Sequence, residues 1–403
     1  IMFKGLSLKV LIFGFIFTFF SSFGQSFFLG LFNSSIRDAL SISHGQFGTI
    51  YASATLCSSL LLIWVGKKID DVNVFKFAFY VTILLSFSCF FFSKISSVIF
   101  LFIAIFLMRF SGQGMMSHTA TTTISRYFTK SRGKALSTGW FGLSVAEFIL
   151  PVLMVYLLTI YAWQNIWLSI SILVLIFLPI VSFFLVKDLN LNSREKSEND
   201  EYKEKNIKQW RRIEVIKDYR FYIICSNMLA MPWIATGVFV YQSFITSSKE
   251  WGEFIIAQSF MAYSICSVVT LLISGFLIDK FTSRKLLIYM NIPLLLSTFV
   301  IMFLSNEYSA FIFLGLIGIS NGLANVLGSS TWAEIYGVKY IGSIKALTTA
   351  LMVFSTAFGT ALFGILIDFG FTIEKIAIVS AIYIFSSIVL LFFTRRKLNP
   401  VII

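Results

Sequence analysis

Two ionisable side chains, Arg109 and Glu147, lie inside long apolar stretches of this 403-residue chain. A charge at the centre of a membrane helix costs roughly 2.5–3.5 kcal/mol on insertion scales, so such a residue normally faces a cavity or a partner. At about 1.5 Å per helical residue, Arg109 lies roughly 25 Å from Arg126, and Glu147 lies roughly 22 Å from Arg132. If these stretches are membrane helices, we expect both side chains at a similar depth in the membrane.

That pairing of residue types allows two kinds of chemistry. A guanidinium group binds a carboxylate in bidentate geometry, and a carboxyl group in a low-dielectric site takes up a proton more easily than one in water. Arg109 is therefore a candidate substrate-binding residue and Glu147 a candidate proton-coupling residue. The alternative is a structural ion pair that fastens two helices together.

A second candidate site is a stripe of polar and small residues. Asn321, Asn325, Gly328 and Trp332 follow the spacing i, i+4, i+7 and i+11, which places them on one face of a helix. This stripe has two alternative roles: contact with a small molecule, or amide hydrogen bonding between helices.

The sequence contains few residues that could support other kinds of catalytic chemistry. The chain has two His, and its four Cys lack CxxC spacing, so we expect no metal and no cofactor. His118 lies nine residues from Arg109, on the opposite helix face, which favours a hydrogen-bonded packing role over a proton relay. No phosphate-binding loop is present. A membrane-embedded enzyme or a receptor is a distant alternative, and we expect a chain that is not an enzyme.

The composition is typical of a membrane protein. The chain is 57% hydrophobic and 13% charged, it contains 47 Phe, and its mean hydropathy is +0.86. Continuously apolar runs of about 20 residues predict membrane helices rather than the alternating strands of a barrel. The expected fold is all-α, with twelve spans at residues 10–32, 46–65, 76–93, 97–121, 133–158, 166–186, 221–246, 254–278, 285–304, 309–332, 343–367 and 376–394.

Three motif pairs indicate an internal duplication. Gly66 and Asp70 recur 209 residues later as Gly275 and Asp279, at the same four-residue spacing. Ser111 aligns with Ser320 at the same offset, and Lys134–Thr138 recurs as Lys345–Thr349 after 211 residues. Repeats of this kind are the architecture of many secondary transporters. We predict a six-helix half at 1–186, a cytoplasmic linker at 187–220 and a second six-helix half at 221–403.

Basic residues predict the orientation. With both termini inside, 27 of the 32 Lys and Arg residues lie on the cytoplasmic side and four in outer loops. This asymmetry also explains the net charge of +13, so no nucleic-acid partner is expected. We expect a monomeric, multi-pass protein of the cell (inner) membrane, with the lipid bilayer and a small-molecule substrate as its partners.

The spans, the long central loop and the loop motifs resemble the major facilitator superfamily. Its signature between helices two and three is matched by Gly66, Asp70 and Lys76, and more closely by the second copy with Gly275, Asp279 and Arg284. The resemblance implies that these glycines and aspartates, with Arg284, act in gating at the cytoplasmic ends of the halves. Arg109–Gly114 and Phe23–Phe28 give a weaker resemblance to the monocarboxylate and oxalate/formate branch, although that branch usually carries an arginine in helix eight, where this chain has no charge.

In that superfamily, helices one, four, seven and ten line the central cavity. The resemblance therefore implies substrate contacts from Arg109, Gln25, Gln113, Trp233, Asn321, Asn325 and Trp332. For Trp233, ordinary packing is the alternative.

The predicted function is secondary active transport of a small organic solute, an organic anion such as a monocarboxylate, by alternating access with possible coupling to protons. A proton-driven exporter of amphipathic compounds is the alternative, although the Gly-Pro-rich antiporter motif is not found in helix five, which has Gly142 and Pro151.

Overall fold

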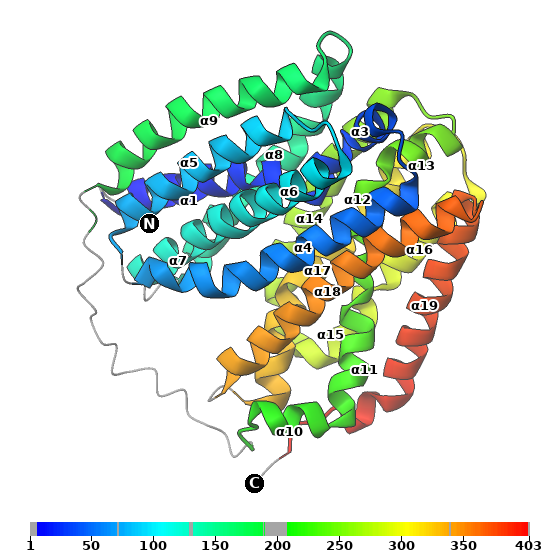
Figure 1. Cartoon of the computed structure of the whole chain (residues 1–403). Coiled ribbons are helices and arrows are strands. Elements are labelled where there is room, and N and C mark those ends of the chain that lie inside the picture. Colours follow the sequence, from blue (N-terminus) through cyan, green and yellow to red (C-terminus); the bar gives the residue numbers. More distant parts are fainter. Residues whose placement is uncertain are drawn as a thin grey trace. The chain divides into compact units, whose positions relative to one another are not determined.

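The computed structural model describes residues 6–70, 72–128, 132–187, 189, 208–337 and 340–401. Throughout these ranges the regular secondary structure is helical and includes no strand (Figure 1). The predicted all-α class is therefore confirmed.

Twelve helices are long and apolar enough to cross a membrane, as the sequence predicts. Their bounds differ from the predicted ones by a few residues, mostly where a helix continues beyond its apolar core. The spans are Leu6–Gly30, His44–Val65, Val74–Phe92, Val98–Tyr127, Ala135–Leu158, Trp163–Val186, Tyr219–Val240, Phe254–Ile278, Ser283–Phe303, Tyr308–Tyr336, Ile344–Asp368 and Ile373–Lys397.

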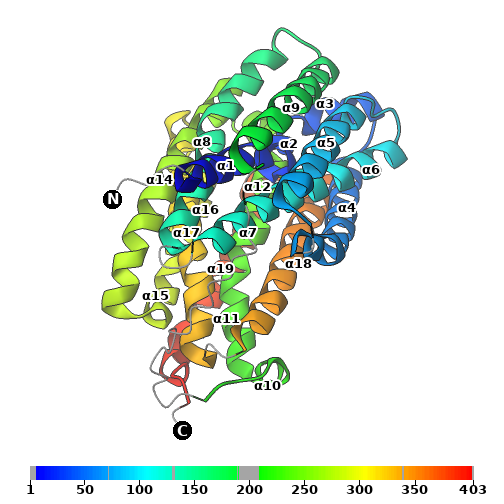
Figure 2. The ribbon, with the colours of Figure 1, turned by 90° about the vertical axis from the view of Figure 1, so that its left-hand side faces the viewer.

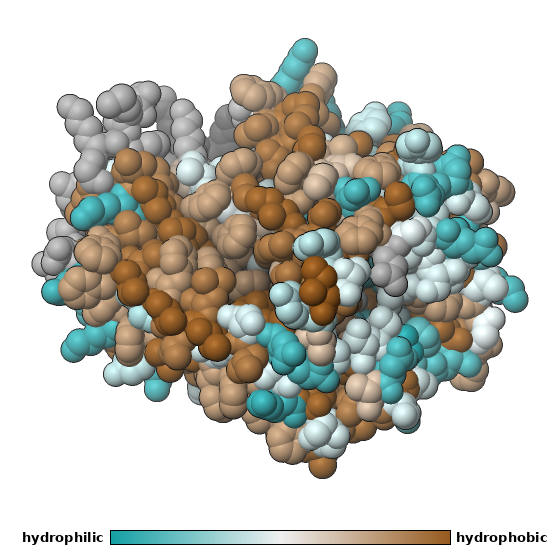
Figure 3. Space-filling view, turned by 90° about the horizontal axis from the view of Figure 1, so that it is seen from above, coloured by the Kyte–Doolittle hydropathy of each residue, from teal (hydrophilic) through white to brown (hydrophobic). Residues whose placement is uncertain are grey.

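Large apolar side chains cover much of the outer surface. Trp64, Phe276, Phe303 and Phe393 are each at least 75% exposed. Figure 3 shows a face on which apolar residues predominate and polar residues gather in patches. Exposed apolar area on this scale is typical of a lipid-facing surface.

The chain divides into two compact units, Ile1–Asn199 and Asp200–Ile403. Unit 1 contains α1 (Leu6–Ser21), η1 (Ser22–Gly24), α2 (Ser26–Gly30), α3 (Asn33–Leu40), α4 (His44–Val65), η2 (Gly66–Asp70), α5 (Val74–Phe92), α6 (Val98–Met108), η3 (Arg109–Met116), α7 (Ser117–Tyr127), α8 (Arg132–Leu158) and α9 (Trp163–Val186). Of the predicted linker, residues 188 and 190–207 lie outside the described part of the chain.

Unit 2 has the corresponding set of spans. It contains α10 (Arg212–Lys217), α11 (Tyr219–Met228), α12 (Ala230–Val240), α13 (Gln242–Ser248), α14 (Glu253–Phe281), α15 (Ser283–Met290), α16 (Ile292–Phe303), α17 (Tyr308–Tyr336), α18 (Ile341–Asp368), α19 (Ile373–Thr394) and η4 (Arg395–Lys397). Figure 2 shows these helices from a second side.

The two units use the same helix pairings, which is the structural form of the duplication. In unit 1, α1 packs on α8, α4 on α6, and α5 on α9; in unit 2, α12 packs on α18, α14 on α17, and α16 on α19. These are the first and fifth, second and fourth, and third and sixth spans of each unit.

In both units a glycine allows the first and fifth spans to pack closely. A Cβ on Gly142 of α8 would lie 2.8 Å from the carbonyl carbon of Phe15, and one on Gly359 of α18 would lie 2.7 Å from the Cα of Trp233. Small residues allow helix backbones to approach in this way inside a membrane.

Local sequence also determines where several helices begin. The Ser43 hydroxyl accepts from the Gln46 backbone N–H, and the Gln46 side chain accepts from the Ser43 backbone N–H, which forms a capping box at the start of α4. Asn73, Ser97 and Thr372 cap α5, α6 and α19 through single side-chain acceptors.

Candidate functional site

The first span is broken in the middle, between α1 and α2. Residues Ser22–Gly24 form a single 3-10 turn, and Gln25 is extended with φ −83° and ψ 153° before α2 starts at Ser26. The carbonyl groups at such a break lack their usual helical partners, so they are available to other donors.

The fourth span is irregular at the same place. Between α6 and α7, residues Arg109–Met116 form a π-helix, a wider turn that is often found at functional sites. A Cβ on Gly112 would lie 2.8 Å from the Cα of Gly24, so the backbones of the break and of η3 are in direct contact. Only glycine at both positions permits this approach.

Arg109 bridges these two irregular segments. Its Nη1 donates to the Gly24 carbonyl at 3.1 Å and to the Ser26 hydroxyl at 3.2 Å. The guanidinium carbon lies 5.4 Å from the ring centroid of Tyr51 in α4, and the Tyr51 hydroxyl donates to Ser26 Oγ at 3.0 Å. Groups of the first and second spans therefore hold this side chain, which itself belongs to the fourth span.

The charge of Arg109 is not neutralised by an acidic side chain in the described part of unit 1. The residue is 3% exposed, its Nε has no hydrogen-bond partner, and none of the described ion pairs includes it. Among the described residues, only dipoles and the face of an aromatic ring stabilise the cation. Such a site favours an anionic ligand, because an unpaired buried charge is costly.

Glu147 does not provide that counter-charge. It is 9% exposed in α8, and no ion pair joins it to Arg109 in the described structure, so the predicted alternative of an Arg109–Glu147 pair is not what this structure contains.

The level of Glu147 follows from helix packing. The Thr18 hydroxyl donates to the Gly139 carbonyl, and α8 also contacts η1 and α2. Glu147 lies five residues beyond Gly142, about 7.5 Å further along α8, and so reaches the level of the break. The equal depth expected for Arg109 and Glu147 therefore agrees with the packing of α8 on α1.

The two predicted glutamines lie at the same break. Gln25 occupies the extended position between η1 and α2, Gln113 lies in η3, and both side chains are half-buried. Sequence reasoning missed Ser26 and Tyr51. The signal for Ser26 was its place next to Gln25 in the helix-one motif, whereas nothing in a single sequence distinguishes Tyr51 from the other tyrosines.

Unit 2 contains a cavity of about 230 Å³. The predicted stripe of Asn321, Asn325, Gly328 and Trp332 lines it from α17, together with residues of α11, α12, α14, α15 and α18. The helical spacing thus identified one wall of a cavity. None of the lining residues that the structure describes is charged.

Trp233 does not line this cavity. Its ring packs in edge-to-face geometry against Phe358, Phe363 and Tyr383, and the residue is 4% exposed. Of the two readings of Trp233, the structure therefore favours packing over substrate contact, because the helix α12 turns this ring toward α18 and α19.

The first copy of the loop motif forms a 3-10 helix, η2, attached to the fourth span. His118 Nε2 lies 2.9 Å from the Gly66 carbonyl oxygen, and Arg126 Nη1 donates to the Ile69 carbonyl at 3.1 Å. His118 thus has the hydrogen-bonded packing role expected for it. The side chain of Asp70 lies outside the described residues.

The second copy differs from the expected arrangement at its glycine. Gly275 was expected to permit a close helix approach, yet a Cβ there would meet no atom within 4 Å. The glycine is solvent- or lipid-exposed on α14, so close packing does not explain it in this conformation. The side chain of Asp279 lies outside the described residues.

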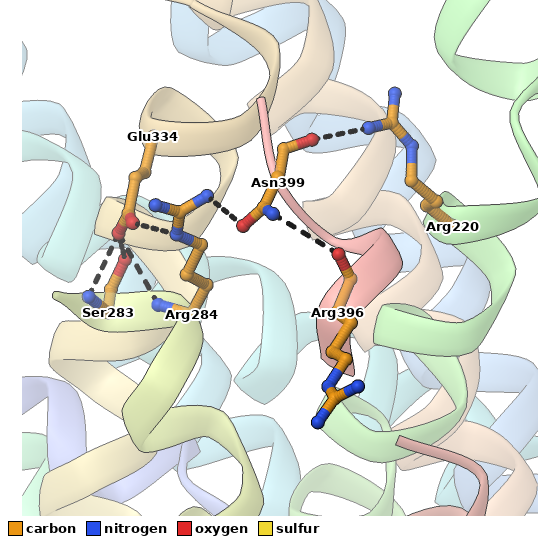
Figure 4. A network of polar contacts seen from close by, with 6 residues as sticks. All are labelled: Arg220, Ser283, Arg284, Glu334, Arg396 and Asn399. Carbon is orange, nitrogen blue, oxygen red and sulfur yellow. Dashed lines mark hydrogen bonds and ion pairs between the residues drawn. The ribbon is translucent and has the colours of Figure 1, made fainter. Parts of the chain in front are cut away.

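Arg284 is part of a network at one end of unit 2 (Figure 4). Its Nε lies 2.8 Å from Glu334 Oε1, while the other carboxylate oxygen of Glu334 accepts from the hydroxyl and backbone N–H of Ser283. Arg284 Nη1 also donates to Asn399 Oδ1 at 2.8 Å, and Arg220 Nη1 donates to the Asn399 carbonyl at 2.8 Å. The carboxylate partner of Arg284 is thus Glu334 of α17, which sequence reasoning did not single out.

Comparisons with known proteins point to one family. The sequence profile described as Major Facilitator Superfamily matches residues 14–257 and 222–402. No curated protein sequence gives a significant match.

Solved structures agree in fold. A bacterial homologue of the human lysosomal transporter Spinster, inward-facing and unoccupied, is 13% identical, with 98% of each chain covered and a TM-score of 0.74. The nucleoside transporter NupG is 14% identical, with 98% of this chain and 99% of that chain covered and a TM-score of 0.71. Identities this low show a shared fold and do not identify a substrate.

Proposed function

The chain belongs to the major facilitator superfamily, and from that premise we propose that it carries a small organic anion across a membrane by alternating access. That it is a transporter of small solutes, and not an enzyme, follows from the family. The anionic substrate, the proton coupling, the monomeric state, the cell-membrane location and the cytoplasmic termini are parts of the proposal.

The environment of Arg109 is the observation that supports an anionic substrate. The Arg109 guanidinium is 3% exposed, its Nε is unpartnered, and no carboxylate of the described part of unit 1 forms an ion pair with it. It lies where two spans are irregular. A bound carboxylate would supply the missing charge and accept from the free donor. Gln25 and Gln113 lie at the same break, and their proposed role is to add neutral hydrogen bonds to the substrate.

Glu147 supports the proposed coupling to protons. A buried carboxyl group at the level of the helix break, outside any ion pair in the described structure, has its charge stabilised by no partner. Protonation removes the cost of burying that charge, so the proton and the substrate anion are expected to enter together.

Gating is proposed at the cytoplasmic ends of the units, from Gly66, Asp70, Gly275, Asp279 and Arg284. Support comes from the attachment of η2 to the fourth span in unit 1 and from the Arg284–Glu334 ion pair in unit 2. In unit 1 the contacts join η2 to α7, and in unit 2 the ion pair joins α15 to α17. Both contacts are of a kind that a rocking motion can break and reform.

A proton-driven exporter of amphipathic compounds is the second candidate. The observation in its favour is the cavity of unit 2, whose lining carries no charge and is largely apolar. An uncharged amphipathic solute would need no buried cation, so the role of Arg109 distinguishes the two candidates.

The test is uptake of radiolabelled lactate, benzoate and hexanoate into proteoliposomes that contain the purified full chain. We expect saturable uptake that an acidic exterior stimulates. Arg109→Lys should lower it by about tenfold or more, because an ammonium group cannot reproduce the guanidinium fork and a charge-assisted hydrogen bond contributes about 1.5–3 kcal/mol. Arg396→Lys, in η4, is the matched control and should leave uptake unchanged. Uptake that persists in Arg109→Lys would contradict the anion proposal.

A further inference from the structure

Three consecutive basic residues follow the last helix of unit 2. They form the η4 turn, namely Arg395, Arg396 and Lys397, directly after the end of α19, and all three are exposed. None of the ion pairs in the described part of the chain includes them. The turn therefore carries positive charge that no described carboxylate neutralises.

The face of α19 that leads to this turn is apolar and exposed. Ile382, Phe385 and Phe393 share that face, and each is more than half exposed. Exposed apolar side chains on a membrane-spanning helix are typical of a lipid-facing surface. Arg396 follows Phe393 by three residues and so continues the same face. The basic turn thus lies where a lipid-facing helix ends, at the level of the membrane surface.

A fourth basic residue lies on the neighbouring span. Lys285 is exposed on α15, and Tyr289, four residues later on the same face, is also exposed. Both α15 and α16, which form this span, contact α19. Tyrosine is enriched where a membrane meets water, because its ring is apolar and its hydroxyl is polar. Tyr289 therefore supports the same membrane level for Lys285 as for η4.

Asn399 holds the basic turn close to α15 (Figure 4). Its Nδ2 donates to the Arg396 carbonyl at 3.2 Å, and its Oδ1 accepts from Arg284 Nη1 at 2.8 Å. In Figure 4 the Arg396 side chain extends away from these contacts. The backbone of η4 is therefore held by the end of α15, while the charged groups of the turn stay on the surface.

We propose that η4 and Lys285 bind the headgroup of an anionic phospholipid at this end of unit 2. The phosphate accepts charge-assisted hydrogen bonds from the basic side chains, and the acyl chains lie on the apolar face of α19. Clusters of about four or more Lys and Arg directly beyond a membrane helix are typical of anionic-lipid binding. The adjoining apolar face favours a lipid over a soluble phosphate, which would gain nothing from it.

The experiment measures the melting temperature of the purified full chain in dodecyl maltoside micelles that contain increasing mole fractions of dioleoylphosphatidylglycerol. Dioleoylphosphatidylcholine, which has the same acyl chains and no net charge, is the reference lipid. A lipid that binds only the folded chain stabilises it, so we expect the anionic lipid to raise the melting temperature more than the reference lipid does. High salt should reduce the difference, because it screens exposed charges.

The double variant Lys285→Gln/Lys397→Gln removes one charge from each side of the site. Each basic residue near an anionic membrane surface strengthens binding by about fivefold, so the mole fraction that gives half of the stabilisation should rise about tenfold or more. Asn399→Ala removes no charge but releases the turn, and the loss of one hydrogen bond should raise the same midpoint about threefold. Arg396→Lys keeps the positive charge and leaves the site intact.

Lys375→Gln is the matched control on the same helix. Lys375 is exposed near the opposite end of α19, and its Nζ lies 5.9 Å from the ring centroid of Phe371. It follows the acidic Glu374 directly and does not belong to a run of basic residues. Its midpoint should equal that of the wild type. Each variant is compared with its own melting temperature without lipid, which separates lipid binding from a change in folding.

Four results would overturn the inference. They are equal stabilisation of the wild type by the two lipids, a wild-type midpoint in Lys285→Gln/Lys397→Gln, a wild-type midpoint in Asn399→Ala, and equal stabilisation by soluble glycerol phosphate. The third would indicate a diffuse attraction instead of a built site, and the fourth would show that the acyl chains contribute nothing. None of these measurements involves a transported solute, so the inference and the proposed function fail independently.

Discussion

At the scale of single residues, Arg109 is the least expected feature of the molecule in energetic terms. Its guanidinium is held by one carbonyl, one hydroxyl and the face of Tyr51, and one of its nitrogens has no partner. Such an arrangement is less stable than a neutral side chain of similar size would be. The proposed role of Arg109 in binding an anion accounts for a residue of this cost at the position.

The absence of an Arg109–Glu147 pair in the described structure leads to a stability prediction. Replacing one partner of a buried ion pair is strongly destabilising, whereas replacing both partners restores stability. Without a pair, the effects of Arg109→Met and Glu147→Gln should add to within about 0.5 kcal/mol, as for independent sites. Melting temperatures of the two single variants and the double variant measure this. A double variant more stable than either single one would show that the two residues do pair.

Glu147→Gln should also separate coupling from binding. Glutamine has the shape of the protonated carboxyl group but cannot release a proton, so pH-driven accumulation should be lost while exchange of internal for external solute persists. Both activities are measured in the same proteoliposomes, with and without a pH gradient. Accumulation that remains at the wild-type level would remove Glu147 from the coupling step.

At the scale of elements, the crossing of the broken first span and the π-helix η3 positions the site. Gly24 and Gly112 allow their backbones to touch, and this contact brings Ser26 and the Gly24 carbonyl within reach of Arg109. Two helices of regular geometry would leave these polar groups in their own hydrogen bonds. The irregular backbone therefore supplies the hydrogen-bond acceptors of the guanidinium.

Gly112→Ala tests that crossing. Its Cβ would lie within 3.0 Å of backbone atoms of Gly24, which cannot move aside as a flexible side chain can, so a destabilisation of about 1–3 kcal/mol is expected together with loss of transport. Gly114→Ala is the control in the same π-helix. Its nearest neighbours at 3.3–3.4 Å are the side-chain methyls of Leu62 and the Arg109 carbonyl oxygen, so its effect should be smaller. Equal melting temperatures for the two variants would contradict this account.

The Arg284–Glu334 ion pair connects α15 to α17. Both side chains are 23% exposed, so solvent screens the pair, and a double-mutant cycle with Arg284→Gln and Glu334→Gln should give a coupling of about 1 kcal/mol or less. Glu334→Gln should be the more destabilising single change, because the carboxylate also accepts from Ser283. Thermal unfolding in detergent measures both values. A larger effect from Arg284→Gln would show that Asn399, and not Glu334, is its main partner.

At the scale of the whole molecule, two units of similar internal pairing are the basis of the proposed alternating access. The same three span pairs recur in each unit, and in both units a glycine allows the first and fifth spans to meet. The proposed alternating access requires units that move as rigid bodies, and the close helix contacts within each unit support this part of the proposal.

The orientation predicted from the basic residues can be tested on intact cells. A single cysteine introduced at Asn199, after replacement of the four native cysteines, should react with an impermeant maleimide only once the cells are permeabilised. A cysteine at Lys94, in a predicted outer loop, is the control and should react in intact cells. The reverse pattern would invert the topology.

The sequence by itself determined the class, the twelve spans and the duplication. These follow from the free-energy cost of exposing apolar surface to water and of leaving backbone groups unpaired in lipid. Both costs depend on local runs of apolar residues, which are visible in the sequence. The helical period also placed Asn321, Asn325, Gly328 and Trp332 on one wall, since residues at that spacing share a face wherever the helix packs.

Tertiary structure alone decided which residues meet. Whether Arg109 pairs with Glu147 depends on the rotation of two helices about their axes, which the sequence spacing within each helix does not define. The same holds for Trp233, which faces a cluster of rings, and for Tyr51 and Glu334, whose partners belong to other spans. The break at Ser22–Gln25 and the π-turn at Arg109 arise where two backbones touch. Contacts between distant segments fix these features, and a single sequence does not encode them locally.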